Sequence, residues 1–278
     1  MRQILFPTDF SPTADNAFVY ALRLAQQLKA EIILFHAFNY TTAQALFAPA
    51  DVLEEVNAVR HDTAYAQFQA YEKMAQEDPS MPIRLHPVVR QGFAADVILE
   101  LCEEYQPYLV VMGTKGSSNL AHDILGSVTT TVLKSARFPV MGIPEYARFQ
   151  GIHKIAYATD LQEKNLRDLY QLTQIARALE ARAFAVHIAT ALPPGDAEAH
   201  LREMEDRFSP GMEFDTVSLR VVAASSAAKG LDAFIEQENI DLLAIHPHQR
   251  TFFDELFHPS LTQQMALHAR IPVLALHG

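Results

Sequence analysis

The chain contains an internal repeat, and this repeat constrains its fold more strongly than any other feature of the sequence. Residues 4–9 (ILFPTD) resemble residues 155–160 (IAYATD), and both segments are apolar runs that end in Thr-Asp. A later apolar run contains His36 in the first copy and His187 in the second, each at the same spacing from the Thr-Asp pair. A repeat of this length indicates two copies of one domain in tandem.

We predict domains at residues 1–145 and 151–278, each long enough to bury a core of its own. The second copy is the shorter one. Its missing residues fall between the second and third strands, where the first copy carries a long helical stretch at residues 51–77. The acidic and basic side chains at the start of that stretch are interpreted as a solvated helix face.

Short apolar runs alternate with helical stretches along the chain, which predicts an α/β fold with parallel crossovers. We expect two tandem open parallel five-stranded sheets with helices on both faces. Ser11 followed by Pro12 is a predicted start of the first helix. Ligands of such sheets lie beyond the carboxyl ends of the strands. In the first copy the expected strands are residues 4–6, 32–38, 85–89, 109–112 and 140–143.

Charge and composition exclude several classes of protein. The net charge is -11, from 22 Lys plus Arg against 33 Asp plus Glu, which disfavours binding to nucleic acid or to anionic membranes. The single cysteine, Cys102, excludes an internal disulfide and a Cys-based zinc cluster, and its place in an apolar helical stripe predicts a buried thiol. No signal peptide or membrane-spanning segment is legible, so we expect a soluble cytoplasmic protein.

The loop after the fourth strand has the composition of a phosphate site. Gly113 and Gly116 are followed, after nine intervening residues, by Gly126 and Ser127, which open a helix. Glycines allow a sharp turn and close approach of a ligand to the backbone, and a helix amino terminus favours an anion. Ser127 and Thr129 can add hydroxyl donors, and Lys115 is the natural side chain for a terminal phosphate. A turn that merely leads into a capped helix is the simpler alternative.

The spacing Gly113-x-x-Gly116-x9-Gly126-Ser127, together with the opening run ILFPTDFS, resembles the universal stress proteins, and the repeat makes the whole chain similar to a tandem member. The resemblance implies a fold like that of adenine nucleotide hydrolases and an ATP site in the first copy, with or without Mg²⁺. It implies that Asp9 faces the ribose, that the backbone near Ala37 meets the adenine, and that the glycines and Ser127 surround the phosphates. The implied nucleotide-binding residues are Pro7, Thr8, Asp9, Ala37, Met112, Gly113, Lys115, Gly116, Gly126, Ser127, Val128 and Thr129.

The second copy lacks this loop and serves as an internal control. His246, Gln249 and Pro259 stand where the first copy has its three glycines, and Ser260 matches Ser127. Proline removes a backbone donor and places a ring where a phosphate would lie. We therefore expect the second copy to keep the fold and to have lost this mode of nucleotide binding.

Other polar residues leave alternatives open. Asp9 is either a ribose ligand or a turn-forming Asx residue, and the repeated His36 is interpreted as a core histidine. His246, His248 and His258 fit no standard zinc pattern, so no structural metal is expected. No catalytic residues are assigned.

The sequence favours a cytoplasmic stress protein that binds ATP in its first domain, with the second domain as a structural or regulatory partner. The last strands, at residues 140–143 and 273–276, could pair within one chain to form a pseudo-dimer; a homodimer and an unidentified protein partner stay open. One alternative is a slow ATPase or self-phosphorylating enzyme, although no general base can be named. The other is a nucleotide-free interaction module.

Overall fold

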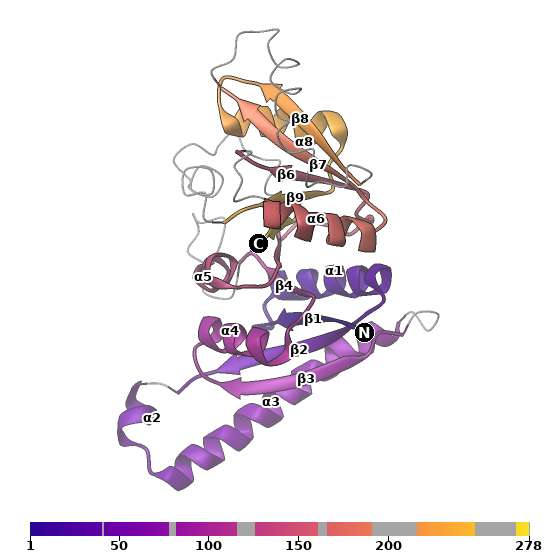
Figure 1. Ribbon diagram of the computed structural model, residues 1–278. Helices are drawn as coiled ribbons and strands as arrows, with labels where there is room; N and C mark the ends of the chain where they lie inside the picture. The colour runs from indigo at the N-terminus through magenta and orange to yellow at the C-terminus, as the bar shows by residue number, and fades with distance from the viewer. Residues whose placement is uncertain are drawn as a thin grey trace.

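A computed structural model describes residues 1–40, 42–77, 82–115, 126–160, 166–190, 216–247 and 271–277. Strands and helices alternate through the first half of the chain, and the predicted strands are all present (Figure 1). A short helix, α2, precedes the long helix α3 and was not expected from the sequence. The elements are β1 (Arg2–Pro7), α1 (Pro12–Leu28), β2 (Ala30–Phe38), α2 (Thr42–Phe47), α3 (Ala50–Gln76), β3 (Leu85–Gln91), α4 (Ala94–Tyr105), β4 (Leu109–Gly113), α5 (Ser127–Ser135) and β5 (Val140–Ile143).

The second half repeats this order in the part that the structure describes. Its first two strands and the helix between them correspond to β1, α1 and β2. The last strand, expected at residues 273–276, is present as β10. The elements are β6 (Lys154–Ala158), α6 (Leu166–Ala178), β7 (Arg182–Ala189), β8 (Val217–Ala223), α8 (Ala227–Glu238), β9 (Leu242–Ile245) and β10 (Val273–Ala275).

The described strands form one sheet in the order β3-β2-β1-β4-β5-β10-β9-β6-β7-β8. Each half contributes five strands that run parallel to one another, which confirms the predicted fold class. The two sets meet where β5 pairs antiparallel with β10, Met141 lying opposite Leu274. The two five-stranded sheets are thus continuous edge to edge.

The core lies on both faces of this sheet because alternate side chains of a strand point to opposite sides. Ile4 and Phe6 of β1 pack under α1 and α3, and the same cluster continues to α6 in the second half. Leu5 of β1 points to the other face and joins a cluster covered by α4, α5 and α8. Helices therefore cover both faces, as the alternation of elements predicts.

Local sequence explains where α1 begins. The Ser11 hydroxyl accepts a hydrogen bond from the Ala14 N–H at 3.2 Å, and Pro12 occupies the first turn. This confirms the predicted helix start. The helix ends at Lys29, which adopts the left-handed conformation with φ 52°. The chain then enters β2 directly, and β1 pairs with β2 over the whole length of β1.

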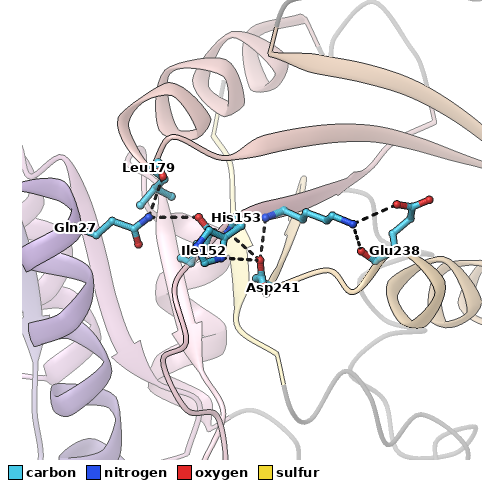
Figure 2. Close-up of polar contacts among 7 residues, drawn as sticks. Gln27, Ile152, His153, Leu179, Glu238 and Asp241 are labelled. Carbon is cyan, nitrogen blue, oxygen red and sulfur yellow. Dashed lines mark hydrogen bonds and ion pairs between the residues drawn. The ribbon is translucent and has the colours of Figure 1, made fainter.

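Polar contacts reinforce the join between the halves at the amino ends of the strands. The Gln27 side-chain amide of α1 donates to the Leu179 carbonyl at 2.9 Å and to the Ile152 carbonyl at 3.4 Å (Figure 2). Asp241 accepts hydrogen bonds from the backbone N–H groups of His153 and Lys154 at 2.8 and 2.9 Å. These bonds hold the segment that enters β6 against both halves.

Candidate functional site

A cavity of about 220 Å³ lies at the carboxyl ends of β1, β2 and β4, beside the amino terminus of α5. Every residue of the predicted nucleotide site that falls within the described part of the chain lines this cavity, whereas Gly116 lies outside that part. The cavity is also lined by four residues that sequence reasoning missed. Its lining is Pro7, Thr8, Asp9, Ala14, Phe35, Ala37, Ala94, Ile98, Met112, Gly113, Lys115, Gly126, Ser127, Val128 and Thr129.

The end of β1 places the Asp9 carboxylate at the mouth of this cavity. The Thr8 N–H continues the parallel ladder by donating to the Phe35 carbonyl at 2.8 Å, and Asp9 follows as an exposed residue. Asp9 Oδ1 accepts from the Ser11 N–H at 3.1 Å, which is the geometry of an Asx turn. The turn-forming role of Asp9 is therefore present. The same carboxylate also lines the cavity, so a ligand role stays a prediction.

The His36 ring is held in place by the backbone at the end of β1. Its Nδ1 lies 2.9 Å from the Thr8 carbonyl oxygen, and in the second half His187 Nδ1 lies 3.1 Å from the Thr159 carbonyl oxygen. The repeated contact ties the second strand of each half to the end of the first, which supports the structural interpretation of His36. Burial lowers the pKa of His36, and the bond to the Thr8 carbonyl and the charge of Asp9 oppose this shift only in part.

The Thr8 side chain is also held in place. Its Oγ1 lies 3.0 Å from the Tyr71 hydroxyl of α3 and accepts from the Phe10 N–H at 3.0 Å. The Tyr71 hydroxyl in turn donates to Asp15 of α1 at 2.7 Å. Burial and the bond to Asp15 raise the pKa of Tyr71 well above its usual value, so this phenol stays protonated. The turn after β1 is therefore linked by hydrogen bonds to α3 and, through Tyr71, to α1.

Gly113 packs closely against α1, and its backbone lines the cavity. A Cβ atom at this position would lie 3.3 Å from Thr13 Cγ2 and 3.4 Å from the Thr13 carbonyl oxygen of α1. The missing side chain therefore makes room for α1, while the Gly113 backbone lines the cavity. That glycine here also keeps the approach of a ligand open stays a prediction.

The amino terminus of α5 faces the cavity with its first residues. Gly126 is the N-cap and supplies no capping side chain, while its own N–H donates to the Thr114 carbonyl at 2.7 Å. The first N–H groups of the helix, at Ser127 and Val128, have no acceptor within the helix. Helix α5 therefore presents donors and the positive end of its dipole at this wall.

Thr129 contributes differently from the prediction. Its hydroxyl donates to the Gly113 carbonyl at 2.9 Å, so this hydrogen ties α5 to the end of β4. Thr129 therefore lines the cavity while its hydroxyl holds α5 to β4. Ser127 is exposed, lines the same wall and makes no such bond to β4. Among the described lining residues, Asp9 and Lys115 carry the ionisable side chains, and they come from different strand ends.

The cavity has one apolar wall and one polar wall. The apolar wall, called the apolar slot below, is the part of the lining that comes from β2 and α4: Phe35, Ala37, Ala94 and Ile98. The polar wall consists of the end of β4, Lys115 and the start of α5. Such a site can hold a molecule with a planar apolar part, hydroxyl groups near Asp9 and an anionic tail.

The second half differs at the position of Gly113. His246 follows β9, and its Nδ1 lies 2.9 Å from Oδ2 of Asp168, which is fully buried. The same Asp168 oxygen accepts from the Tyr157 hydroxyl at 2.7 Å. The imidazole therefore packs toward α6. Gln249, Pro259 and Ser260, on which the predicted loss of the second site depends, lie outside the described residues.

Two features of other functional classes are absent from the described residues. None of the helices described there combines the length and the apolar composition required to cross a bilayer. In the same residues, no three His, Cys, Asp or Glu side chains converge on a point suited to a metal ion. His248 and His258, which were considered with His246 as possible zinc ligands, lie outside this portion of the chain.

Comparisons with known proteins agree with the repeat and with the fold. The model of the universal stress protein family matches twice, at residues 1–144 and 151–277. A universal stress protein of Methanocaldococcus jannaschii is 28% identical over 140 residues, which cover 50% of this chain and 80% of that protein. Universal stress protein G of Salmonella typhimurium is 32% identical over 144 residues, 50% of this chain and 96% of its own.

A solved structure extends the likeness to the whole chain. The crystal structure of a universal stress protein from Archaeoglobus fulgidus aligns over 99% of this chain and 98% of that one, with a TM-score of 0.67 and 17% identity. At that identity the likeness shows the fold alone. Because the family model covers both halves, the chain belongs to the universal stress protein family, as a tandem member with two repeats.

Proposed function

We propose that the amino-terminal half binds an adenine nucleotide, namely ATP, and that the protein acts in a cytoplasmic stress response. The observation that carries this proposal is one cavity that combines an apolar slot, a carboxylate and an uncapped helix amino terminus. Each of these features suits a different part of a nucleoside triphosphate. Membership of the family supports the same function.

The nucleoside would occupy the wall formed by the ends of β1 and β2. Adenine would stack in the slot beside Phe35 and Ile98, next to the backbone of Ala37. A carboxylate accepts hydrogen bonds from two hydroxyl groups, and Asp9 stands where the ribose would lie. Because one oxygen of Asp9 already bonds the Ser11 N–H, the carboxylate is oriented before the ligand binds.

The phosphates would occupy the wall formed by the end of β4 and the start of α5. The free N–H groups at Ser127 and Val128 supply donors that need no movement to bind an anion. Lys115 adds a positive charge at the same wall. This arrangement explains how a chain of net charge -11 can hold a polyanion: oriented amides and one lysine act locally, where the distant charges are screened.

The carboxy-terminal half would act as a structural and regulatory partner. The antiparallel pairing of β5 with β10 makes the two halves of one chain resemble the two subunits of a dimer. ATP would favour the conformation that binds it better, and a protein partner would respond to that shift in population. The two halves would be separate domains, at residues 1–145 and 151–278.

Isothermal titration calorimetry with ATP tests the proposal. The structure predicts saturable binding that Lys115→Glu weakens at least tenfold, because a cation at the phosphate wall becomes an anion. Lys229→Glu, the same change on an exposed lysine of α8, is the matched control and should bind as the original protein does. Equal affinity in the two variants, or no binding by the original protein, would contradict the proposal.

A slow ATPase or self-phosphorylating enzyme is the second candidate. No described residue of the cavity has the place of a general base other than Asp9, which is engaged by the Ser11 N–H. Single-turnover incubation with Mg-ATP separates the candidates. Survival of stoichiometric ATP overnight supports binding alone, whereas conversion of ATP to ADP, with the phosphate released or attached to the protein, supports the enzyme.

A further inference from the structure

A second cavity lies on the opposite face of β2, between this strand and α3. It encloses about 540 Å³, within the size of clefts that hold small organic ligands. His36 and Phe38 of β2 line it, whereas Ala37, between them in the strand, lines the first cavity. Because successive side chains of a strand point to opposite faces, the two cavities are separate and lie on opposite sides of the sheet.

Helix α3 closes against the sheet at one end and leaves this cavity open at the other. Its buried residues are Ala64, Phe68, Tyr71 and Ala75, all in the carboxy-terminal part. No residue of α3 before Ala64 is buried, although valines recur at helical spacing there. In Figure 1 the first turns of α3 and the whole of α2 lie past the arrowheads of β2 and β3.

Apolar side chains form the wall of the cavity that α3 supplies. Val56 is half-buried, Val59 is 59% exposed, and both line the cavity together with Ala64. Phe38 forms the floor from β2. An exposed valine beside an aromatic floor leaves apolar surface that a ligand of matching size would remove from water.

His36 lines the same cavity and has one ring nitrogen that can accept a hydrogen bond. Its Nδ1 faces the Thr8 carbonyl oxygen at 2.9 Å, and a carbonyl can only accept, so Nδ1 carries the hydrogen. In the neutral ring the other nitrogen, Nε2, is then an acceptor. The ring is held by Phe10, whose centroid lies 4.7 Å away. Burial lowers the pKa of His36, and the charge of Arg60 acts in the same direction.

Arg60 supplies a cation. Its guanidinium is close enough to His36 to act on that ring electrostatically, and both residues line the cavity. Within the described residues Arg60 forms no ion pair, and neither does Glu55 on the preceding turn of α3. A guanidinium offers a planar set of donors that matches a carboxylate or a sulfonate.

We propose that this second cavity binds a small amphipathic organic anion. Arg60 would bind its carboxylate or sulfonate, Phe38 and the valines of α3 would cover its aromatic or aliphatic body, and His36 Nε2 would accept a hydrogen bond from an N–H or O–H group on it. The site lies on the face of the sheet opposite the proposed nucleotide cavity and does not depend on nucleotide binding.

The probe for this site is 8-anilinonaphthalene-1-sulfonate, which combines a sulfonate, an aromatic body and an N–H group. Calorimetric titration should give one molecule of probe per chain. Arg60→Glu and Val59→Asp should each weaken binding at least tenfold, because both place a negative charge in the cavity. Val59 is exposed, so its replacement leaves the packing of α3 intact.

Each variant has a matched control. Val52→Asp changes an exposed valine of the same helix that does not line the cavity, and Arg137→Glu reverses an exposed arginine after α5. Both should bind the probe within twofold of the original protein, and so should Ser127→Asp at the first cavity. Absence of saturable binding, equal losses in variants and controls, or loss in Ser127→Asp alone would overturn the proposal. All variants are compared at matched thermal midpoints, since the probe also binds partly unfolded chains.

Discussion

Ser127→Asp separates the stability of the protein from its affinity for a nucleotide. Ser127 is an exposed residue in the first turn of α5, where the N–H groups lack acceptors and no side chain caps the helix. An aspartate there interacts favourably with the positive end of the helix dipole, a gain of about 0.3–1 kcal/mol in folding free energy. The variant should therefore unfold at the same temperature as the original protein or slightly above it.

The same substitution should weaken ATP binding. If the new carboxylate and the nearest phosphate charge are about 8 Å apart, with an effective dielectric constant of about 20, they repel by about 2 kcal/mol. Screening by solvent at this exposed position reduces the repulsion to about 1–2 kcal/mol. Since 1.4 kcal/mol corresponds to a factor of ten, the dissociation constant should rise about five- to thirtyfold. The effect should shrink as salt is added.

Calorimetric titration with ATP at low and high salt, combined with thermal denaturation, measures both effects. The control is Ala227→Asp at the first residue of α8, which adds the same charge to a helix amino terminus in the other half. It should alter stability similarly and leave ATP affinity unchanged. Unchanged affinity in Ser127→Asp, in a protein that binds ATP, would refute the placement of the phosphates at α5.

Three further predictions concern packing and titration. Burial raises the pKa of Cys102 to about 12, from 9.0, so the thiolate is about a thousandfold scarcer and a disulfide reagent at pH 8 should label the thiol only after unfolding; rapid labelling of the native protein would contradict its buried place in α4. The pKa of His36 is lowered by burial, so the folded state disfavours its charged form, and the stability that neutral His36 provides is lost as pH falls from the ordinary pKa of 6.5 through the lowered pKa of the folded state. Urea unfolding at pH 7.5 and 5.5 should accordingly show a larger loss for the original protein than for His36→Gln, and equal losses would remove this assignment. Gly113→Ala should lower the unfolding free energy by about 1 kcal/mol, because the new methyl group crowds Thr13 of α1, and a higher thermal midpoint would show that α1 has room to move.

Most of the fold could be predicted because the periodicity of apolar residues and the internal repeat can both be read directly from the sequence. The run at residues 4–6 predicted β1, and pairing with β2 extends the strand to Arg2–Pro7 because Arg2 lies opposite Ala30. Helix α2 was missed because Thr42–Phe47 spans only 6 residues, less than two helical turns. Short helices of this kind depend on tertiary contacts more than on propensity.

The site was predictable where residues carry a signature and obscure where they do not. Gly126 and Ser127 could be found from their spacing, whereas Phe35 and Ile98 look like ordinary core residues in the sequence and line the cavity only because β2 and α4 converge there. The contact of Asp168 with His246 was missed because the two residues are distant in sequence; the one signal was an aspartate beside the apolar stripe of α6.

Native mass spectrometry of the protein incubated with ATP tests the central claim most directly, because it counts bound nucleotides per chain. The account predicts one ATP per chain for the original protein and for Ala227→Asp, with occupancy reduced in Ser127→Asp. Two nucleotides per chain would show that the second half retains a site, and none would show that the cavity beside α5 does not bind ATP.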